Sequence, residues 1–420
     1  MRVKANAAKI LISDSKWLEF VECHFVQIYA AFVIIGQLFN QRVAGPITVL
    51  FALLALVIGR LLAQSQNKSS HSRDGYWNQI NRWWFWAGFA LFAWSAISLT
   101  WGVAGFDIVS RPVKQALYLF SAMNLLYFVS LHKQKFHPWV STVALILFIF
   151  LCYQHFFNVF PLYSVKYPET YFNRIFVTNV LLTFVVAGAF LTQYNNKKIA
   201  VSVVILLAIT TGLFVFGSSS ETSKLIWITG WPLLLIAYFL NAKMQNVMLG
   251  ILSFTPFLTP FVLKYSNAMF VNLSNSNMDW IIQSSSATRL GIWQETIKLI
   301  ELRPLFGYGN DAMVFLTNNE LLKNSLFKGG ELKVGHPHNA FLQIWLEYGF
   351  VGAVLSCIFL VMISLRIAKL PNRIRSTALT LFSTIMIVSM VSHGAWQSWW
   401  LGSIILVSTI VSSLARSTAN

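Results

Sequence analysis

The sequence predicts an all-α, polytopic membrane protein with about twelve transmembrane helices. Of the 420 residues, 56% are hydrophobic and only 11% are charged, whereas a soluble domain is usually about one quarter charged. The apolar residues gather in separate runs, each close to the roughly 20 residues that a helix needs to cross a bilayer. The bilayer is therefore the main solvent of this chain.

The predicted spans divide the chain into three parts. Residues 1–263 hold spans one to nine, residues 264–339 form one long loop, and residues 340–420 hold spans ten to twelve. The loop of some 75 residues stands out because long connections between packed elements are usually functional or disordered. In chain order, the spans are 20–39, 46–63, 83–103, 112–131, 139–157, 175–193, 199–216, 225–240, 247–263, 340–365, 376–395 and 398–414.

The Lys and Arg residues are distributed unevenly between alternate loops. If the N-terminus is cytoplasmic, 17 of them fall in cytoplasmic segments and six in short outer loops. Because positively charged loops stay in the cytoplasm, both termini are predicted to be cytoplasmic and the long loop to lie outside. The net charge of +17 is then explained by topology, with an anionic substrate as a further use, and no nucleic-acid partner is expected.

The three cysteines, Cys23, Cys152 and Cys357, lie in apolar runs far apart in the sequence. This spacing predicts neither a disulfide framework nor a metal site. We therefore expect no bound metal and no cofactor.

The long outer loop contains one predicted helix. Serines from Ser284 can cap its start, and Trp293, Ile297 and Ile300 follow at i, i+4 and i+7 on one face. Pro304 ends the helix. The pattern is typical of an amphipathic helix lying on the outer membrane surface.

Two arginines mark the ends of this helix. Arg289 falls in the first turn, where a cation opposes the helix dipole, which indicates another purpose such as an anion site. Arg303 falls in the last turn, where favourable helix-end electrostatics alone can account for it.

The stretch GHPHNAFLQ then leads into span ten. Pro337 disfavours helix at the preceding His336, so the span begins near His338 or Asn339, and Asn339 is a good N-cap. The positive end of the helix dipole lowers the imidazole pKa of His338 and favours its neutral form. A neutral imidazole can accept a proton; the alternative is a polar residue that only marks the membrane surface.

The same span carries further candidates. Gly349 and Gly352 lie close to the direction of His338 around the helix, and small residues there let another helix pack close. Glu347 lies on the opposite face, as a functional carboxylate or a structural ion-pair partner. His336 is read as positional, and His393 is a second histidine near the outer surface.

These residues together resemble the O-antigen ligase and polymerase superfamily of bacterial envelope proteins. The pattern His-Asn, nine residues, Gly-x-x-Gly is met by His338, Asn339, Gly349 and Gly352. The preceding pattern of Arg, Trp and Pro-Leu-Phe-Gly-x-Gly is met by Arg289, Trp293 and the residues from Pro304 to Gly309. The resemblance covers mainly residues 285–355.

The resemblance implies a GT-C-like, metal-independent glycosyltransferase of the bacterial inner membrane with its active site on the periplasmic side. Its donor would be a glycan on undecaprenyl pyrophosphate, and a ligase would transfer it to a sugar hydroxyl of the lipid A core. His338 would be the general base. The implied substrate-binding residues are Arg289, Arg174, Lys224, Asn339, Trp293 and Arg303.

Two of these residues rest on weaker matches in earlier outer loops. The stretch YFNRIFVTN offers Arg174 where the family tends to carry an arginine. In the next outer loop the family usually reads Ser-Arg, but here Ser220 is followed by Glu221. Lys224 is the nearest cation that could substitute, and headgroup binding is the alternative role for both cations.

Other functions remain open from the sequence. An O-antigen polymerase would use the same residues with another lipid-linked glycan as acceptor. A relative that transfers glycan to protein is disfavoured, because the chain ends soon after Arg416. A twelve-span transporter is disfavoured because the halves show no repeat of broken helices. The single candidate base predicts a single displacement that inverts the anomeric configuration.

Overall fold

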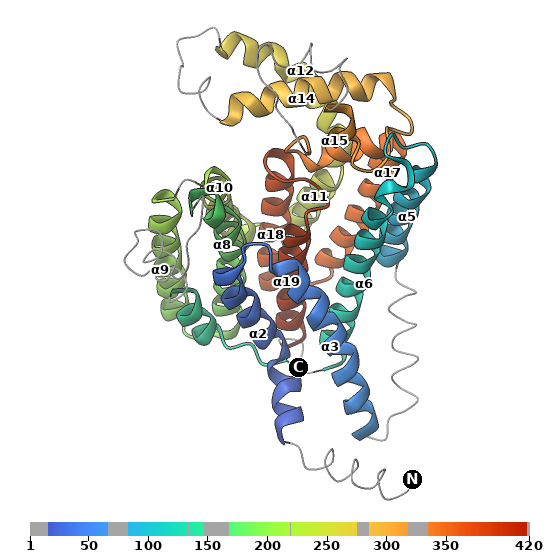
Figure 1. Ribbon diagram of the computed structural model, residues 1–420. Coiled ribbons are helices and arrows are strands. Elements are labelled where there is room, and N and C mark those ends of the chain that lie inside the picture. Colours follow the sequence, from blue (N-terminus) through green and yellow to red (C-terminus); the bar gives the residue numbers. More distant parts are fainter. Residues whose placement is uncertain are drawn as a thin grey trace, which may run out of the picture.

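A computed structural model describes residues 16–65, 83–132, 134–146, 168–218, 220–274, 285–317 and 335–417. Within these residues every regular element is helical, as predicted. The main helices are α2 (Lys16–Phe39), α3 (Ala44–Ser65), α5 (Trp83–Ile97), α6 (Ser110–Leu131), α8 (Pro168–Gln193), α9 (Lys197–Phe216), α10 (Glu221–Phe239), α17 (Ala340–Ala368), α18 (Asn372–Val391) and α19 (Ser398–Ser417). Four others, α11 (Ala242–Ser253), α12 (Thr255–Ser274), α14 (Ser285–Leu302) and α15 (Ala312–Thr317), lead to one end of this bundle (Figure 1).

Eight of the described helices are long and apolar enough to cross a membrane, and the pair α11–α12 would add a ninth. The chain is therefore a multi-pass membrane protein. Helix α5 has 15 residues, fewer than a full span needs, and α6 is not among the eight. Most of the predicted span 139–157, with Cys152, lies outside the described residues. The count of twelve stays a prediction.

The predicted span 247–263 is not a single straight helix. Helices α11 and α12 meet at an angle of 67°. Pro256, the second residue of α12, has no N–H to continue the ladder of α11 and fits the first turn of a new helix. Helix α12 continues to Ser274, so the predicted part boundary at residue 264 falls inside a continuous helix.

Helices α8, α18 and α19 form the centre of the bundle. The shares of their apolar windows buried inside the protein are 83%, 78% and 67%, against 33% for α9 and α10. Hydroxyl pairs tie neighbouring helices in this region, because each buried hydroxyl needs a partner where water is excluded. Thr178 of α8 lies 2.8 Å from Ser403 of α19, and Thr48 of α3 lies 2.5 Å from Tyr29 of α2.

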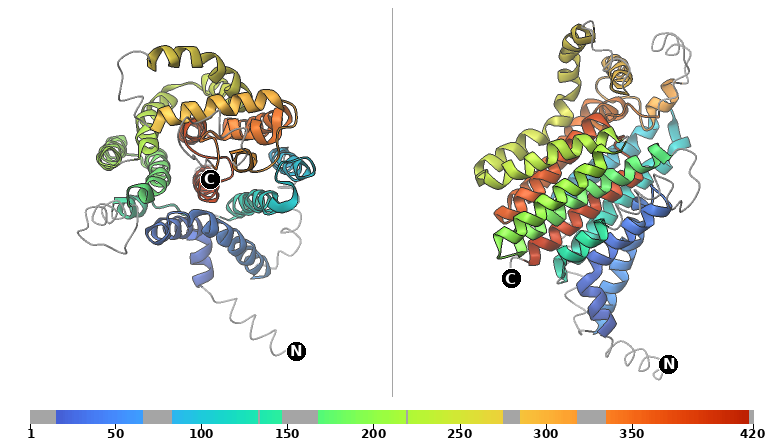
Figure 2. Two further views of the ribbon diagram at one scale, coloured as in Figure 1. Left: turned by 45° about the horizontal axis from the view of Figure 1, so that its top comes forward. Right: turned by 90° about the vertical axis from the view of Figure 1, so that its left-hand side faces the viewer.

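The helices of the long loop lie across one end of the bundle. Helices α12 and α14 lie at the top of Figure 1, whereas α2 begins and α19 ends toward the bottom. Figure 2 shows α14 crossing above the ends of the bundle helices. The long loop and the ends of the described chain are thus on opposite sides of the molecule.

The helix predicted in the long loop is present as α14, but its apolar face packs on protein. Ile297 and Ile300 are buried in a cluster with Leu342 and Trp345 of α17. Trp293 packs against the same cluster. The expectation of a helix lying on the membrane surface is therefore corrected, because burying these side chains against α17 removes them from both water and lipid.

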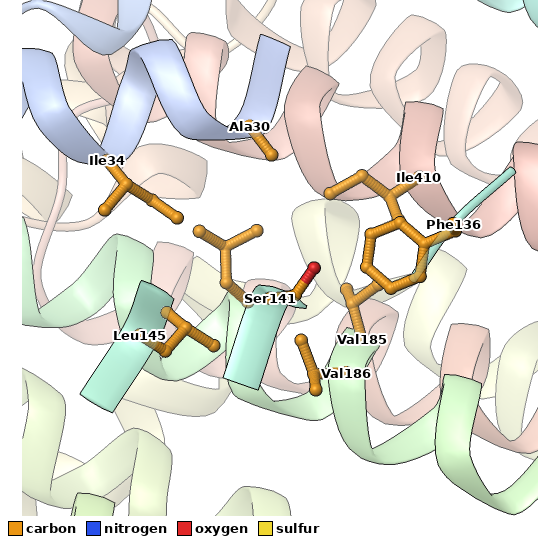
Figure 3. A pocket seen from close by; sticks show the side chains of 9 residues that line it. Ala30, Ile34, Phe136, Ser141, Leu145, Val185, Val186 and Ile410 are labelled. Atoms are coloured by element: carbon orange, nitrogen blue, oxygen red, sulfur yellow. The ribbon is translucent and has the colours of Figure 1, made fainter. Parts of the chain in front are cut away.

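One small cavity lies within the bundle, away from α14. It is lined by residues of α2, α8, α19 and the segment 134–146, and this lining is apolar except for Ser141 (Figure 3). Such a lining has no charged group to bind an anion or to transfer a proton. A site that binds an anion or transfers a proton must therefore lie elsewhere in the protein.

Candidate active site

Three segments that are distant in the sequence meet at the α14 end of the bundle. They are the first turns of α14, residues 335–339 before α17, and the connection between α18 and α19. We call residues 391–397 the α18–α19 loop, counted from the last residue of α18. Its backbone carbonyls hold the two residues that the sequence singled out most strongly.

His338 is fixed in one tautomer by this loop. Its Nδ1 lies 3.1 Å from the carbonyl oxygen of Ser392, and because a carbonyl oxygen only accepts, Nδ1 carries the proton. Within the described part of the chain Nε2 makes no hydrogen bond, so its lone pair is free. The backbone φ of His338 is 54°, a left-handed conformation that costs a non-glycine residue about 1–3 kcal/mol and persists only where surrounding contacts impose it.

The surroundings keep this imidazole neutral. Burial lowers the pKa of His338 below its usual 6.5, the bond to Ser392 opposes this, and the Arg289 guanidinium lowers the pKa further. The sequence predicted the direction from the helix dipole, but burial is the largest cause. A neutral imidazole with an accepting Nε2 can take a proton near pH 7.

Arg289 is held by the carbonyl next to the one that holds His338. Its Nη1 donates to the carbonyl oxygen of Val391 at 3.1 Å. Val391 ends α18, so this bond also places a cation at the negative end of that helix. Burial lowers the pKa of Arg289, but a guanidinium stays protonated and still has further N–H donors to offer an anion.

Asn339 and Trp293 hold the histidine segment in place. The Asn339 side chain caps α17 by accepting from the N–H groups of Phe341 and Leu342, both at 3.0 Å, so the predicted start of this helix is confirmed. The indole N–H of Trp293 donates to the carbonyl of Pro337 at 2.9 Å. With these bonds made, both side chains serve to position His338.

Arg174 reaches the same region from α8. Its guanidinium lies 5.8 Å from the Trp399 ring centroid, and its charge acts on both His336 and His393. His336 accepts the backbone N–H of His338 through Nδ1 at 3.1 Å. Burial lowers the pKa of His336 to about 4, with His338 and Arg174 acting in the same direction.

His393 lies within electrostatic reach of both arginines, Arg174 and Arg289. Its electrostatic neighbours are His336, Arg174, His338 and Arg289, and burial is the main reason that its pKa is well below 6.5. Its ring packs on Trp399, with the centroids 4.7 Å apart, while its buried Nε2 has no hydrogen-bond partner among the described residues. The structure thus brings Arg174, Arg289 and His338 around one residue.

Arg42 is a cation that the sequence analysis used only for topology. It lies between α2 and α3, close enough for its charge to act on Arg174. Within the described residues neither arginine has an ion-pair partner. The signal that could have found Arg42 was its place in a predicted outer loop, where a positively charged residue runs against the predicted charge bias.

Lys224 lies at the edge of this region in an ion pair. Its Nζ is 3.0 Å from Oε1 of Glu221, whose carboxylate also acts on Arg289. Thr222, in the same turn of α10, lies 2.6 Å from the Ser392 hydroxyl. Helix α10 therefore touches the α18–α19 loop, and Lys224 is paired with Glu221, which stands where the resemblance led us to expect an arginine.

Arg303 is not part of this cluster. It follows directly after Leu302, the last residue of α14, and so lies just past the last turn in which it was expected. It is 14 residues from Arg289, about 21 Å if measured along the helix axis. It is exposed, and its guanidinium lies over the Tyr308 ring at 4.8 Å. The structure separates it from the other predicted residues.

Helix α17 is interrupted at Gly349, whose φ of 62° and ψ of −158° are not helical. The turn after α14, residues 304–309, fills the interruption, and a Cβ on Gly349 would meet the Leu305 carbonyl carbon at 2.4 Å. The predicted close packing is thus with this turn and not with another helix. Four backbone bonds join the segments: Tyr308 N–H to Leu346 O (2.8 Å), Gly309 N–H to Glu347 O (2.8 Å), Phe350 N–H to Pro304 O (2.7 Å) and Val351 N–H to Leu305 O (3.3 Å).

Glu347 is buried just before this interruption. Its carboxylate accepts hydrogen bonds from the neutral side chains of Gln343 and Trp396, and it is not among the ion pairs of the described residues. The structural ion pair considered from the sequence is therefore replaced by two neutral donors. Within the same residues no group of three or more His, Cys, Asp or Glu side chains is arranged to hold a metal ion.

Comparisons with known proteins cover the central part of the chain. Residues 177–357 match the family described as O-antigen ligase. A Rickettsia felis protein named "Putative polysaccharide ligase" is 32% identical over 140 residues, which are 32% of this chain and 33% of that protein. A Rickettsia conorii protein with the same description is 31% identical over 137 residues, 32% of this chain and 33% of that protein.

A further relative aligns over a longer stretch. An uncharacterised protein of Haemophilus influenzae is 24% identical over 253 residues, which are 56% of this chain and 62% of that protein. With the Rickettsia proteins, the match spans about a third of their length. The matched region includes Arg289, Trp293, His338 and Gly349, and over residues 177–357 the chain is similar to the O-antigen ligase family.

Proposed function

We propose that this protein is a GT-C-like glycosyltransferase that ligates a glycan from undecaprenyl pyrophosphate onto a sugar hydroxyl of the lipid A core. The observation that carries the proposal is the pair of adjacent carbonyls, Val391 and Ser392, that hold Arg289 and His338 side by side. This arrangement presents a proton acceptor beside a cation. Transfer of a sugar from a diphosphate needs both.

The chemistry follows from the groups in place. The acceptor hydroxyl oxygen attacks the anomeric carbon, and its proton passes to Nε2 of His338, whose Nδ1–H is held by Ser392. The bond between the anomeric carbon and the phosphate oxygen breaks, and undecaprenyl pyrophosphate leaves with the electron pair. Arg289 stabilises the charge that grows on the leaving group, and a single displacement of this kind inverts the anomeric configuration.

The remaining residues support these two. Arg174 and Arg42 supply further positive charge for the pyrophosphate, and Lys224 would join them when its pair with Glu221 opens. Asn339 and Trp293 position the histidine segment. Arg303 is left out of the proposed site because it lies past the end of α14, far from Arg289 near the helix start.

The proposed orientation puts α14 and the long loop in the periplasm and both termini in the cytoplasm, with twelve spans in the inner membrane. It rests on the charge bias of the loops. The placement of α14 on the side opposite the start of α2 and the end of α19 (Figure 1) is compatible with it. Labelling of single cysteines from the periplasmic side tests this orientation directly.

The activity is tested with purified protein, undecaprenyl-pyrophosphate glycan and lipid A–core acceptor, with and without EDTA. Wild type should cap the core whether or not the chelator is present. His338→Ala should lower kcat at least about 100-fold, the usual contribution of a general base. His24→Ala is the matched control, because His24 also donates from Nδ1 to a backbone carbonyl but on α2.

Each outcome assigns the function. Lengthening of the donor glycan without use of the core would make the protein a polymerase. A His338→Ala variant that transfers at the wild-type rate would exclude the base assignment. Loss of activity with EDTA would exclude the metal-independent mechanism.

A further inference from the structure

Glu347 stands out among the buried charged groups that the proposed mechanism does not use. Its side chain is 1% exposed, and both carboxylate oxygens accept hydrogen bonds. Oε1 accepts from Nε2 of Gln343 at 2.8 Å, and Oε2 accepts from the indole N–H of Trp396 at 2.9 Å. A buried carboxylate kept between two neutral donors is costly unless both bonds are made, so these bonds need an explanation.

Both donors connect Glu347 to the α18–α19 loop. Trp396 is part of that loop. Gln343 reaches it through the other end of its amide, because Oε1 accepts the backbone N–H of Ala395 at 2.9 Å. By taking the NH₂ group of Gln343, Glu347 also sets which way this amide faces. The loop is thus fastened to α17 at two consecutive residues.

The same loop holds the proposed catalytic groups from its other end. Ser392 accepts from His338 and Val391 accepts from Arg289. Between these two ends, Gly394 lets the loop backbone lie close to the Gln343 side chain, since a Cβ at Gly394 would lie 2.9 Å from Oε1 of Gln343. The chain of contacts therefore runs from Glu347 through residues 395–396 to the carbonyls of residues 391–392.

We infer that Glu347 is a positioning residue, which sets the orientation of His338 and Arg289 by anchoring the α18–α19 loop to the broken helix α17. This inference rests on the proposed function for its kinetic consequence. Glu347 touches neither reacting group. The backbone of Glu347 is fixed as well, because its carbonyl oxygen accepts the N–H of Gly309 at the interruption of α17. The side chain therefore reaches the loop from a fixed position on α17.

The need for a carboxylate follows from the donors. A glutamine at this position has one accepting oxygen and one NH₂ group, so its NH₂ would face either the Gln343 amide or the Trp396 indole, both of which donate. Turning Gln343 around to accept would remove its bond to Ala395. Glu347→Gln therefore has nearly the same shape but must break one link to the loop.

Four variants test the inference: Glu347→Gln, Trp396→Phe, the double variant, and Trp345→Phe. In the double variant the indole donor is gone. The amide introduced at position 347 can then turn its oxygen toward the NH₂ group of Gln343, and its own NH₂ group no longer faces a donor. Trp345→Phe is the matched control, because Trp345 is also a buried tryptophan that donates an indole N–H, but to Pro256 of α12 and not to the loop.

The first readout is kinetic. Glu347→Gln and Trp396→Phe should each lower kcat by about tenfold to a hundredfold, the scale of a misplaced catalytic group, while KM for the donor stays within twofold. The double variant should be no worse than the worse single variant, since both break the same link. Trp345→Phe should keep the wild-type kcat. An additive double variant, or an equal loss in Trp345→Phe, would overturn the inference.

The second readout does not depend on activity. Diethyl pyrocarbonate modifies neutral imidazole, and mass spectrometry can follow its reaction at His338 as a function of pH. The charged and titratable groups around His338 are Arg289, His336 and His393, and none of them is altered. In Glu347→Gln or Trp396→Phe the modification rate or its pH midpoint at His338 should change, and in Trp345→Phe it should not.

These readouts separate the two proposals. If wild type transfers no glycan but the modification of His338 changes in Glu347→Gln, the proposed function fails and the positioning role stands. If wild type is active and both variants leave kcat and His338 modification unchanged, the positioning role fails alone. Should Glu347→Gln not purify as a folded protein, Trp396→Phe decides the same question.

Discussion

Replacing Gly349 with alanine should weaken the whole site without touching any side chain in it. The backbone at Gly349 has φ 62° and ψ −158°, a region that is essentially restricted to glycine. The Cβ of alanine would also meet the Leu305 carbonyl carbon at 2.4 Å and the Phe306 nitrogen at 2.6 Å. Because both are backbone atoms, the turn of residues 304–309 must move.

The magnitude follows from two contributions. The strained backbone conformation costs alanine about 1–3 kcal/mol. Displacement of the turn weakens the four backbone bonds that cross the interruption, and losing only two of them costs about 2 kcal/mol. Together the variant should be destabilised by roughly 4 kcal/mol.

The measurement is thermal unfolding in detergent, followed by tryptophan fluorescence. At about 2 °C per kcal/mol, the value for large domains, the midpoint should fall on the order of 8 °C. Gly250→Ala is the control, because Gly250 lies in α11 and a Cβ there meets nothing within 4 Å. If both variants unfold at the same temperature, the packing of the turn into the interruption of α17 does not stabilise the folded protein by the expected amount.

Three further predictions concern the charged groups of the site. The kcat/KM of transfer should fall below pH 6.5 as His338 gains a proton. Arg289→Gln should move this fall to higher pH, because the guanidinium helps to lower the pKa of His338. A pH–rate profile in which the acid side does not move would contradict this. Folding stability should decrease as the pH falls from about 6.5 toward 4, because the unfolded chain binds a proton that buried His336 does not, and His336→Asn should flatten part of that slope in melting curves. Arg303→Gln should keep the transfer rate within about twofold of wild type, whereas Arg289→Gln should lower it at least about tenfold; equal losses would return Arg303 to the site.

Local signals in the sequence predicted much of this arrangement. The apolar runs gave the helices, and Pro337 followed by Asn339 gave the start of α17 within one residue. These signals are reliable because an N-cap and a proline act on their immediate neighbours. The candidates Arg289, Arg174 and His338 come together in the structure. Their positions in three separate segments of the sequence could not show this proximity.

The scaffold that joins them was not predictable in the same way. His338 and Arg289 are held by backbone carbonyls, and every residue has one, so no residue type marks Val391 or Ser392. Trp396 lies in the aromatic stretch WQSWW between two predicted spans, where tryptophans commonly anchor helices at the membrane interface, yet it donates a hydrogen bond to Glu347. A side chain that suits the membrane interface also suits a buried hydrogen bond, and composition does not distinguish the two uses.

Gly349 shows a second limit. Two glycines at one helical spacing indicate close packing, which is correct, but spacing does not tell whether the neighbour is a helix or a turn. The deciding quantity is the φ of 62° at a single residue, and this depends on a turn that precedes it by some forty positions.

The anchoring of both catalytic candidates on the α18–α19 loop limits how this protein could be recombined with its relatives. The stretch shared with the family ends at residue 357, before α18 begins. A chimera that received only this stretch would carry the histidine and the arginine but take their supporting carbonyls from the host. Exchange of the histidine and arginine segments between such proteins would therefore succeed only when the last two helices are transferred with them.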